Sequence, residues 1–235
     1  MPLHPSKQKR IAEIGSKLED LIVQFQVNVL ACERELLKLI RAEEAAVLED
    51  LSDHVRADLI ELHVNDDVYW LILAKEEQPR AVLTYVGDRN LREQAYKIWL
   101  TIASEKGPNE QAILSSEDDV RKWQASKVQN PDAGLHNNGP VMDEILRLRQ
   151  EKASLLGFPS YLDMSQVLDK AQPTVDLQQW LSDLIDRIKP LALKEYEEVQ
   201  QFAKEQGLDD FQPWDMYYYT EQLRRKRYSF TEEEV

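Results

Sequence analysis

The sequence has one cysteine, few glycines and no long apolar run. The single Cys32 excludes an internal disulfide. Seven glycines and ten prolines are too few for a turn-rich all-β sandwich or a glycine-rich phosphate-binding fold. The longest apolar run, residues 68–74, is far shorter than the roughly 18 residues of a membrane-spanning helix. No membrane span is therefore expected. Residues 1–10 lack an apolar segment, so no secretory signal is expected either.

Positive charge is also scarce. The 235 residues contain 29 Lys and Arg against 43 Asp and Glu, which gives a formal net charge of −14. A field of this sign repels nucleic acids and anionic membrane surfaces, so neither is expected as a partner. Apolar residues make up 43% and charged residues 31%, and this balance predicts a soluble globular protein rather than a disordered chain.

Most of the chain shows helical periodicity. From about Ser6 to Glu44, apolar residues recur at steps of three and four, which predicts one long helix. Pro190 lies inside another such pattern and should kink or split that helix. The other helices are expected from Ser52, from Asn90 (with Glu93 as a capping box), from Pro140 to Gly157, from about Ser160, from Asp176 to Gly207, and from Trp214 to Arg227.

Residues 65–86 form the least helical segment. Two short strands, over 69–73 and 81–86, are one interpretation, but an extended connection is preferred because two isolated strands are marginally stable. The predicted fold class is therefore all-α, an array of antiparallel helices with an irregular, possibly short-stranded connection around 65–86. Three regions are expected: a long helical hairpin region over 1–107, a loose loop or insertion over 108–139, and a second helical region over 140–235.

The histidines give little sign of a catalytic metal site. No two of the four are four residues apart, so no helix face offers the paired imidazoles of a His-Glu-x-x-His zinc site. His54 and His63, flanked by Asp53 and Glu61, leave a metal role open, but surface histidines are the preferred interpretation. No nucleophile elbow, Walker loop or dinucleotide fingerprint occurs, so no catalytic, cofactor-binding or metal residue is assigned. The four histidines are His4, His54, His63 and His136.

A basic cluster lies near the C-terminus, next to several tyrosines. Its residues are Arg224, Arg225, Lys226 and Arg227. A nucleic-acid contact is one interpretation, and the net charge of −14 opposes it. The preferred interpretation is a helix C-terminus whose cations complement the helix dipole. A contact with a partner protein or a local anion stays open.

Several segments, taken in order along the chain, resemble one protein family. They are Phe25–Leu30, Leu83–Tyr85 followed by Asp88–Glu93, Met142–Arg149 with Leu155–Tyr161, Phe202–Asp215, and Tyr218, Tyr219 and Glu221 followed by Tyr228 and Ser229. Together they resemble the helical half of the oligopeptidase A and thimet oligopeptidase family of zinc metallopeptidases. Residues 108–136 look like an insertion relative to that family.

The resemblance implies that the family's zinc motif and transition-state-stabilising residues lie downstream of the segment matching Tyr228, so none carries over to this sequence. We therefore expect a non-catalytic, peptidase-derived helical protein that acts as a structural or interaction subunit of a larger multi-protein assembly. The alternative is one half of a split or cleaved zinc metallo-oligopeptidase whose second chain carries the His-Glu-x-x-His motif.

The expected partners are other protein subunits that cover the surface facing the catalytic half in relatives. No cofactor and no small-molecule substrate are expected for the chain alone. The expected location is intracellular. Because the family resembled occurs in cytosol, mitochondria and plastids, an organellar and a cytoplasmic location both stay open.

Overall fold

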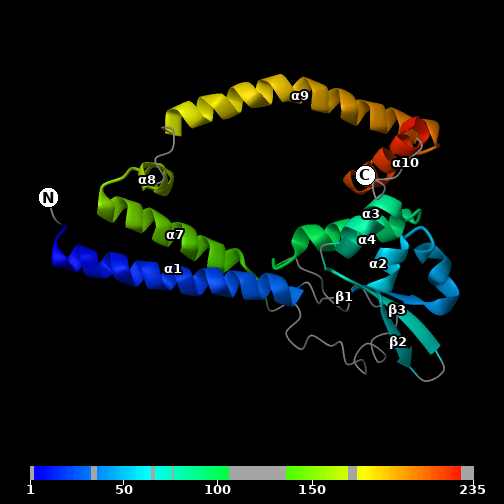
Figure 1. Cartoon of the computed structure of the whole chain (residues 1–235), viewed down its shortest axis with the longest axis horizontal. Coiled ribbons are helices and arrows are strands. Elements are labelled where there is room, and N and C mark those ends of the chain that lie inside the picture. Colours follow the sequence, from blue (N-terminus) through cyan, green and yellow to red (C-terminus); the bar gives the residue numbers. More distant parts are fainter. Residues whose placement is uncertain are drawn as a thin grey trace. The chain divides into compact units, whose positions relative to one another are not determined.

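The computed structural model describes residues 3–32, 36–64, 67–75, 77–105, 136–168 and 174–228. The chain forms two compact units. Unit 1 comprises Met1–Val27 and Asn138–Glu195, and unit 2 comprises Asn28–Asn137 and Tyr196–Val235. Helices make up most of the described residues, which confirms the predicted helical class (Figure 1). Most of the loop predicted over 108–139 falls on residues outside the described ranges.

Unit 1 is built on two helices that lie side by side, α1 (Pro5–Cys32) and α7 (Gly139–Leu156) (Figure 1). Their apolar faces pack together because residues three and four apart share one side of a helix. The salt bridge from Arg10 to Glu151, at 2.6 Å, links the same two helices. The buried core consists of Ile14, Leu18 and Leu21 from α1 with Val141, Ile145 and Leu148 from α7.

The ends of α7 follow the local sequence. Pro140 lies in its first turn, as predicted, where the missing N–H leaves no hydrogen bond unmade. Gly157 ends it in the left-handed region at φ +88°, which only glycine adopts without strain. The remaining elements of unit 1 are α8 (Tyr161–Leu168) and the first part of α9 (Thr174–Glu205).

Unit 2 contains a three-stranded antiparallel sheet in the order β1-β3-β2. The strands are β1 (Leu36–Arg41), β2 (Ile60–Val64) and β3 (Asp67–Leu73), and β3 lies in the middle. The other elements are the 3₁₀-helices η1 (Ala42–Leu48) and η2 (Pro213–Asp215), and the helices α2 (Asp53–Ala57), α3 (Glu77–Tyr85), α4 (Arg89–Thr101) and α10 (Met216–Tyr228).

The core of unit 2 joins the sheet to the helices that follow it. Ile72 of β3 and Val82 and Leu83 of α3 are fully buried. Leu91, Ala95 and Ile98 of α4 are buried on one face, as their spacing predicts. Two edge-to-face aromatic pairs with centroids 6.2 Å apart, Tyr96–Trp214 and Trp99–Tyr217, link α4 to η2 and α10.

The sheet corrects three expectations. The helix predicted over Ser6 to Glu44 ends at Cys32, and Leu36–Arg41 is a strand paired with β3. Residues 60–64, expected in the helix from Ser52, form β2 instead. The preferred extended connection was wrong because β1 supplies a third strand, and three strands with a buried face are stable where two are not. Short apolar runs fit either period, so sequence alone does not separate β1 and β2 from helix.

The structure also corrects several helix boundaries. The strand considered for residues 81–86 is wrong, because α3 covers most of them. The N-cap of α4 is Asp88, whose Oδ1 accepts from the Leu91 N–H at 3.0 Å, and Asn90 lies inside the helix. Helix α9 begins at Thr174, before Asp176, and runs through Pro190 without being split.

None of the described helices combines the length and apolar content that crossing a bilayer requires.

Candidate functional site

One face of α9 is apolar along most of the helix, and its two parts differ in burial. In unit 2, Val199, Phe202 and Ala203 on this face are buried. In unit 1, large side chains at the same helical spacing are 43% to 59% exposed. Because residues three, four and seven apart share one side of a helix, the exposed ones form a continuous stripe. We call them the α9 stripe: Trp180, Leu181, Ile185, Ile188 and Leu191.

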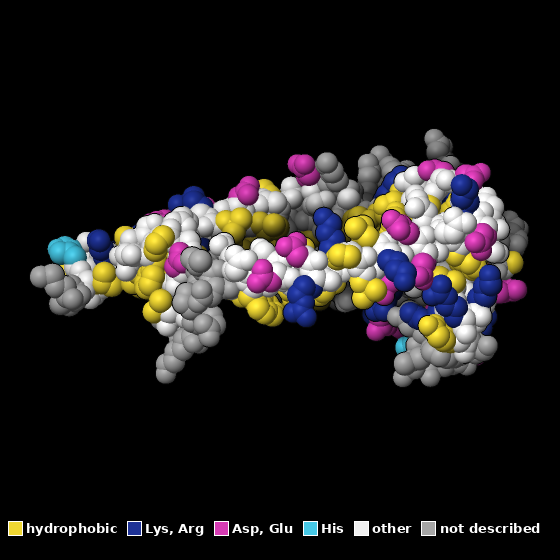
Figure 2. Space-filling view, turned by 90° about the horizontal axis from the view of Figure 1, so that it is seen from above, with side chains coloured by type: hydrophobic (Ala, Val, Ile, Leu, Met, Phe, Trp, Pro, Cys, Tyr) yellow, Lys and Arg dark blue, Asp and Glu magenta, His cyan; other side chains and the backbone are white. Residues whose placement is uncertain are grey.

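The opposite side of α9 carries acidic side chains beside one exposed leucine, Leu193. Asp183 and Asp186 lie on the opposite side of the helix from Ile188 and are exposed. In the space-filling view, acidic and basic side chains are interspersed rather than separated by sign, and apolar side chains lie between them (Figure 2). Full burial of one Leu- or Ile-sized side chain is worth about 1.5–3 kcal/mol. A stripe of four such residues and a tryptophan is therefore a surface suited to bind protein.

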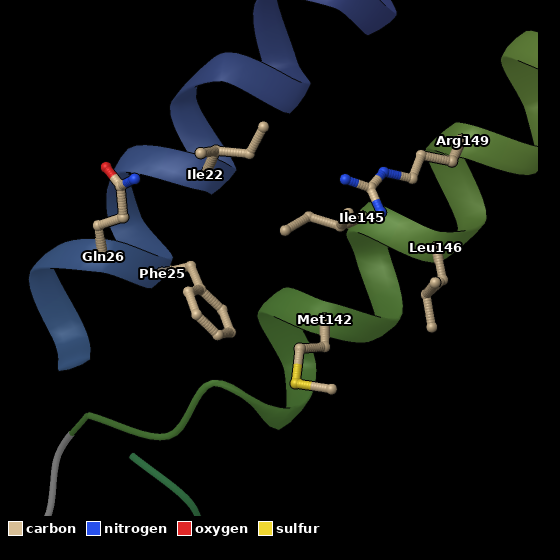
Figure 3. Close-up of a pocket in the computed structure, with 7 residues that line it drawn as sticks. All are labelled: Ile22, Phe25, Gln26, Met142, Ile145, Leu146 and Arg149. Atoms are coloured by element: carbon tan, nitrogen blue, oxygen red, sulfur yellow. The ribbon is translucent and has the colours of Figure 1, made fainter. Parts of the chain in front are cut away.

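A second apolar feature lies between α1 and α7 in unit 1. It is a groove of about 400 Å³ (Figure 3). Ile145 is buried at the core between the two helices, whereas Met142 and Leu146 are about half exposed. The Arg149 guanidinium lies 5.1 Å from the centre of the Tyr161 ring. The lining residues are Ile22, Phe25, Gln26, Met142, Ile145, Leu146 and Arg149. Such a groove accommodates apolar side chains and supplies one cation.

The basic cluster predicted near the C-terminus lies on the last turns of α10. The buried Glu221 carboxylate accepts from Arg224 at 3.0 Å and from Arg225 at 2.8 Å. Arg227 bonds Glu198 at 3.0 Å. The Lys226 ammonium lies 5.0 Å from the centre of the Phe202 ring. These contacts give the four cations partners within unit 2, and both the structural interpretation and a partner or anion contact stay predictions.

A buried ionic network was missed by the sequence reasoning. The Asp215 carboxylate is fully buried and accepts from Arg89 at 2.9 Å and from Arg92 at 3.0 Å. The backbone N–H of Gln212 donates to the same carboxylate at 3.0 Å. Burial raises the pKa of Asp215, but these hydrogen bonds outweigh it and hold the pKa below its usual value. Its role in unit 2 is structural: it ties η2 to α4.

The two histidines considered for a metal role have different surroundings. His63 Nε2 lies 2.9 Å from Glu61, and both side chains are exposed. The flanking residue Asp53 pairs with Arg56 instead of with a histidine. Among the described residues, His54, Asp58 and Glu77 bring one ligand atom each to within 4.8 Å of one another. The sequence pattern indicated His54 but neither Asp58 nor Glu77. Glu77 comes from a different helix, and only the tertiary structure brings it close to His54 and Asp58.

Comparison with known proteins relates the chain to a family of peptidases. Residues 115–235 match the family described as Peptidase family M3. Over 99% of its length the chain is 32% identical to Oligopeptidase A of Salmonella typhimurium and covers 31% of that protein. It is 26% identical to the Organellar oligopeptidase A, chloroplastic/mitochondrial, of Arabidopsis thaliana, again over 99% of the chain and 27% of the relative. The chain thus spans less than a third of the length of these relatives.

Proposed function

The chain belongs to peptidase family M3, and from this premise we propose that it is a helical docking module which cleaves no peptide bond by itself. It acts as a structural or interaction subunit of a larger multi-protein assembly. Its partner is another protein that covers the α9 stripe. The stripe is the observation that carries the proposal.

The unequal burial along α9 supports a protein partner. Val199 and Phe202 are buried in unit 2, whereas Ile185 and Ile188 are more than half exposed. A helix with such a face reaches its lowest free energy when the apolar side chains leave water. Because the relatives are about three times as long as the chain, the residues that they have in addition are the natural source of a cover.

The potential metal-binding residues of the chain support a non-catalytic role. The related family members are zinc metallopeptidases. A zinc site of the His-Glu-x-x-His kind needs two histidines four residues apart on one helix face. The four histidines of these 235 residues include no such pair. The residues present do not fit that site.

The test compares two double variants of the full chain. Ile185→Asp/Ile188→Asp places charge on the stripe, and Asp183→Ala/Asp186→Ala alters the opposite side as a control. We expect the native chain to sediment in a complex well above its own 27.4 kDa and the stripe variant to be released from it, while the control stays bound. A folded chain that is monomeric at its native concentration and binds no hydrophobic dye would overturn the proposal.

A second candidate function has its own support. Identity of 31–32% over 99% of the chain with the Oligopeptidase A proteins of Escherichia coli and Salmonella typhimurium favours a part of a working peptidase. In that case a second chain supplies the His-Glu-x-x-His motif, and the chain described here completes the enzyme.

The two candidates separate in a complementation assay. The chain is mixed with the part of Escherichia coli Oligopeptidase A that lies outside the matched region. Peptide cleavage that a chelator abolishes, and that Ile185→Asp/Ile188→Asp prevents, would favour the second candidate. Binding without cleavage would favour the first.

The location of the chain is also a proposal. Relatives carry the names Organellar oligopeptidase A, chloroplastic/mitochondrial, and Probable cytosolic oligopeptidase A. We therefore propose an intracellular location, either organellar or cytoplasmic. Fractionation of the source cells with an antibody against the chain distinguishes the two.

A further inference from the structure

Three potential metal ligands from two different helices lie close together on the exposed surface of unit 2. His54 lies in α2, and Asp58 is the C-cap of α2, four residues further on. Glu77 lies in the first turn of α3. One imidazole nitrogen and one oxygen from each carboxylate lie within 4.8 Å of one another.

A buried amide holds the two helices in this relation. Gln78, next to Glu77, is only 3% exposed. Its side-chain oxygen accepts from the Leu73 N–H at 2.8 Å, and its nitrogen donates to the Asp58 carbonyl at 3.1 Å. One side chain thus connects the end of β3, the end of α2 and the start of α3. The backbone positions that carry Asp58 and Glu77 are therefore fixed, while the ligand side chains are free to adjust.

We propose that His54, Asp58 and Glu77 bind a divalent transition-metal ion of the Zn²⁺ type, which fastens α2 to α3. One imidazole and two carboxylates suit a borderline ion such as Zn²⁺, whereas Ca²⁺ and Mg²⁺ prefer oxygen ligands alone. Neighbouring ligands of tetrahedral zinc lie about 3.4 Å apart at the usual bond lengths. Small side-chain rotations close the remaining gap, and water completes the coordination at this exposed position.

A lysine forms a salt bridge with one of the three ligands, Asp58. The Lys75 ammonium lies 3.5 Å from Asp58 Oδ2, and both side chains are about half exposed. An arriving metal ion has to displace this ammonium from the carboxylate. The affinity is therefore moderate, and removal of the lysine charge strengthens binding. This second effect connects the bound ion with Asp58, the carboxylate that Lys75 contacts.

The experiment is a calorimetric titration of the full chain with Zn²⁺ at pH 7.5. We expect one site in the micromolar range, with binding at least tenfold weaker in His54→Ala and in Glu77→Gln. His63→Ala is the matched control, because His63 is exposed, pairs with Glu61 and lies outside the cluster, and its affinity should equal that of the parent. Lys75→Met should bind Zn²⁺ several-fold more tightly, and Ca²⁺ should produce no binding signal.

The proposal is overturned if the parent chain takes up no Zn²⁺ at 1 mM, or if His54→Ala binds with the parent's affinity. Circular dichroism checks that each variant keeps the parent fold. Lys75→Met retains all three ligands, so its affinity tests the site even if a ligand variant fails to fold. Unchanged or weaker binding in Lys75→Met counts against the site as described.

Discussion

Arg92 and Asp215 form an ion pair of 3.0 Å in which neither side chain is more than 2% exposed. The two residues are 123 positions apart, one in α4 and the other at the end of η2. Arg92 also donates to the carbonyls of Val86 at 2.8 Å and Gly87 at 2.9 Å. Burial of two charges is costly, and these additional hydrogen bonds offset much of the cost. The pair fastens the C-terminal part of unit 2 to the helices that follow the sheet.

Replacement of Asp215 should destabilise the chain strongly. Asp215→Ala removes the carboxylate and leaves the buried Arg92 guanidinium without its counter-charge, so we expect a loss of about 3–5 kcal/mol in the free energy of unfolding. Urea denaturation measures it. Asp210→Ala is the control, because that side chain is 77% exposed and lies 3.9 Å from Arg89. Equal effects of the two substitutions would show that the buried pair contributes nothing special.

The same carboxyl group predicts a loss of stability in acid. Burial raises the pKa of Asp215, and the hydrogen bonds from Arg89, Arg92 and Gln212 outweigh it, so the folded-state pKa lies below the usual value. A lowered pKa means that the unfolded chain binds the proton more tightly. The stabilisation is therefore complete above about pH 5 and is lost as pH falls through about 4 and below.

Unfolding free energies measured from pH 7 to pH 3 test this. The decline should be shallower in Asp215→Asn, which cannot titrate at this position. Parallel curves for the parent and the variant would contradict the assignment.

The cap of α4 offers a direct test of a corrected prediction. Asp88 accepts from the Leu91 N–H at 3.0 Å, so Asp88→Ala should cost about 1 kcal/mol. Asn90 is exposed and lies inside the first turn, so Asn90→Ala should change stability by less than about 0.5 kcal/mol. Thermal unfolding of both variants measures the difference. A larger effect at Asn90 would restore the capping box expected from sequence.

The basic cluster should prove structural. Arg224→Ala/Arg225→Ala takes two guanidinium groups from the buried Glu221 carboxylate, so we expect a loss of about 3 kcal/mol in the free energy of unfolding. Lys226→Ala/Arg227→Ala removes two cations that are more exposed and should change the free energy of unfolding little.

A gel-shift assay with single- and double-stranded nucleic acid should show no binding by the parent at 0.15 M salt, where a chain of net charge −14 is repelled.

Features that depend on neighbouring residues were predictable. The buried face of α4, the left-handed Gly157 and the first turn of α7 at Pro140 each arise from spacing or from one residue's conformational preference. The long periodic pattern of α9 was also recognised, although Pro190 did not divide it. Local patterns succeed here because helical hydrogen bonds join residues four apart.

Features that depend on distant residues were not predictable. The residues of β1 continue the helical periodicity of the segment before them, and only their pairing with β3 makes them a strand. No pattern links Asp215 to Arg92, or Glu77 to His54, because tertiary packing brings them together.

The sequence by itself determined the helical class, the membership of a peptidase family and the absence of two histidines spaced for a zinc helix, since composition, periodicity and motif order are properties of the chain alone. Only the tertiary structure decided which part of the α9 face is buried and which is exposed. An apolar face has the same pattern in both cases, and its burial depends on which surfaces pack against it.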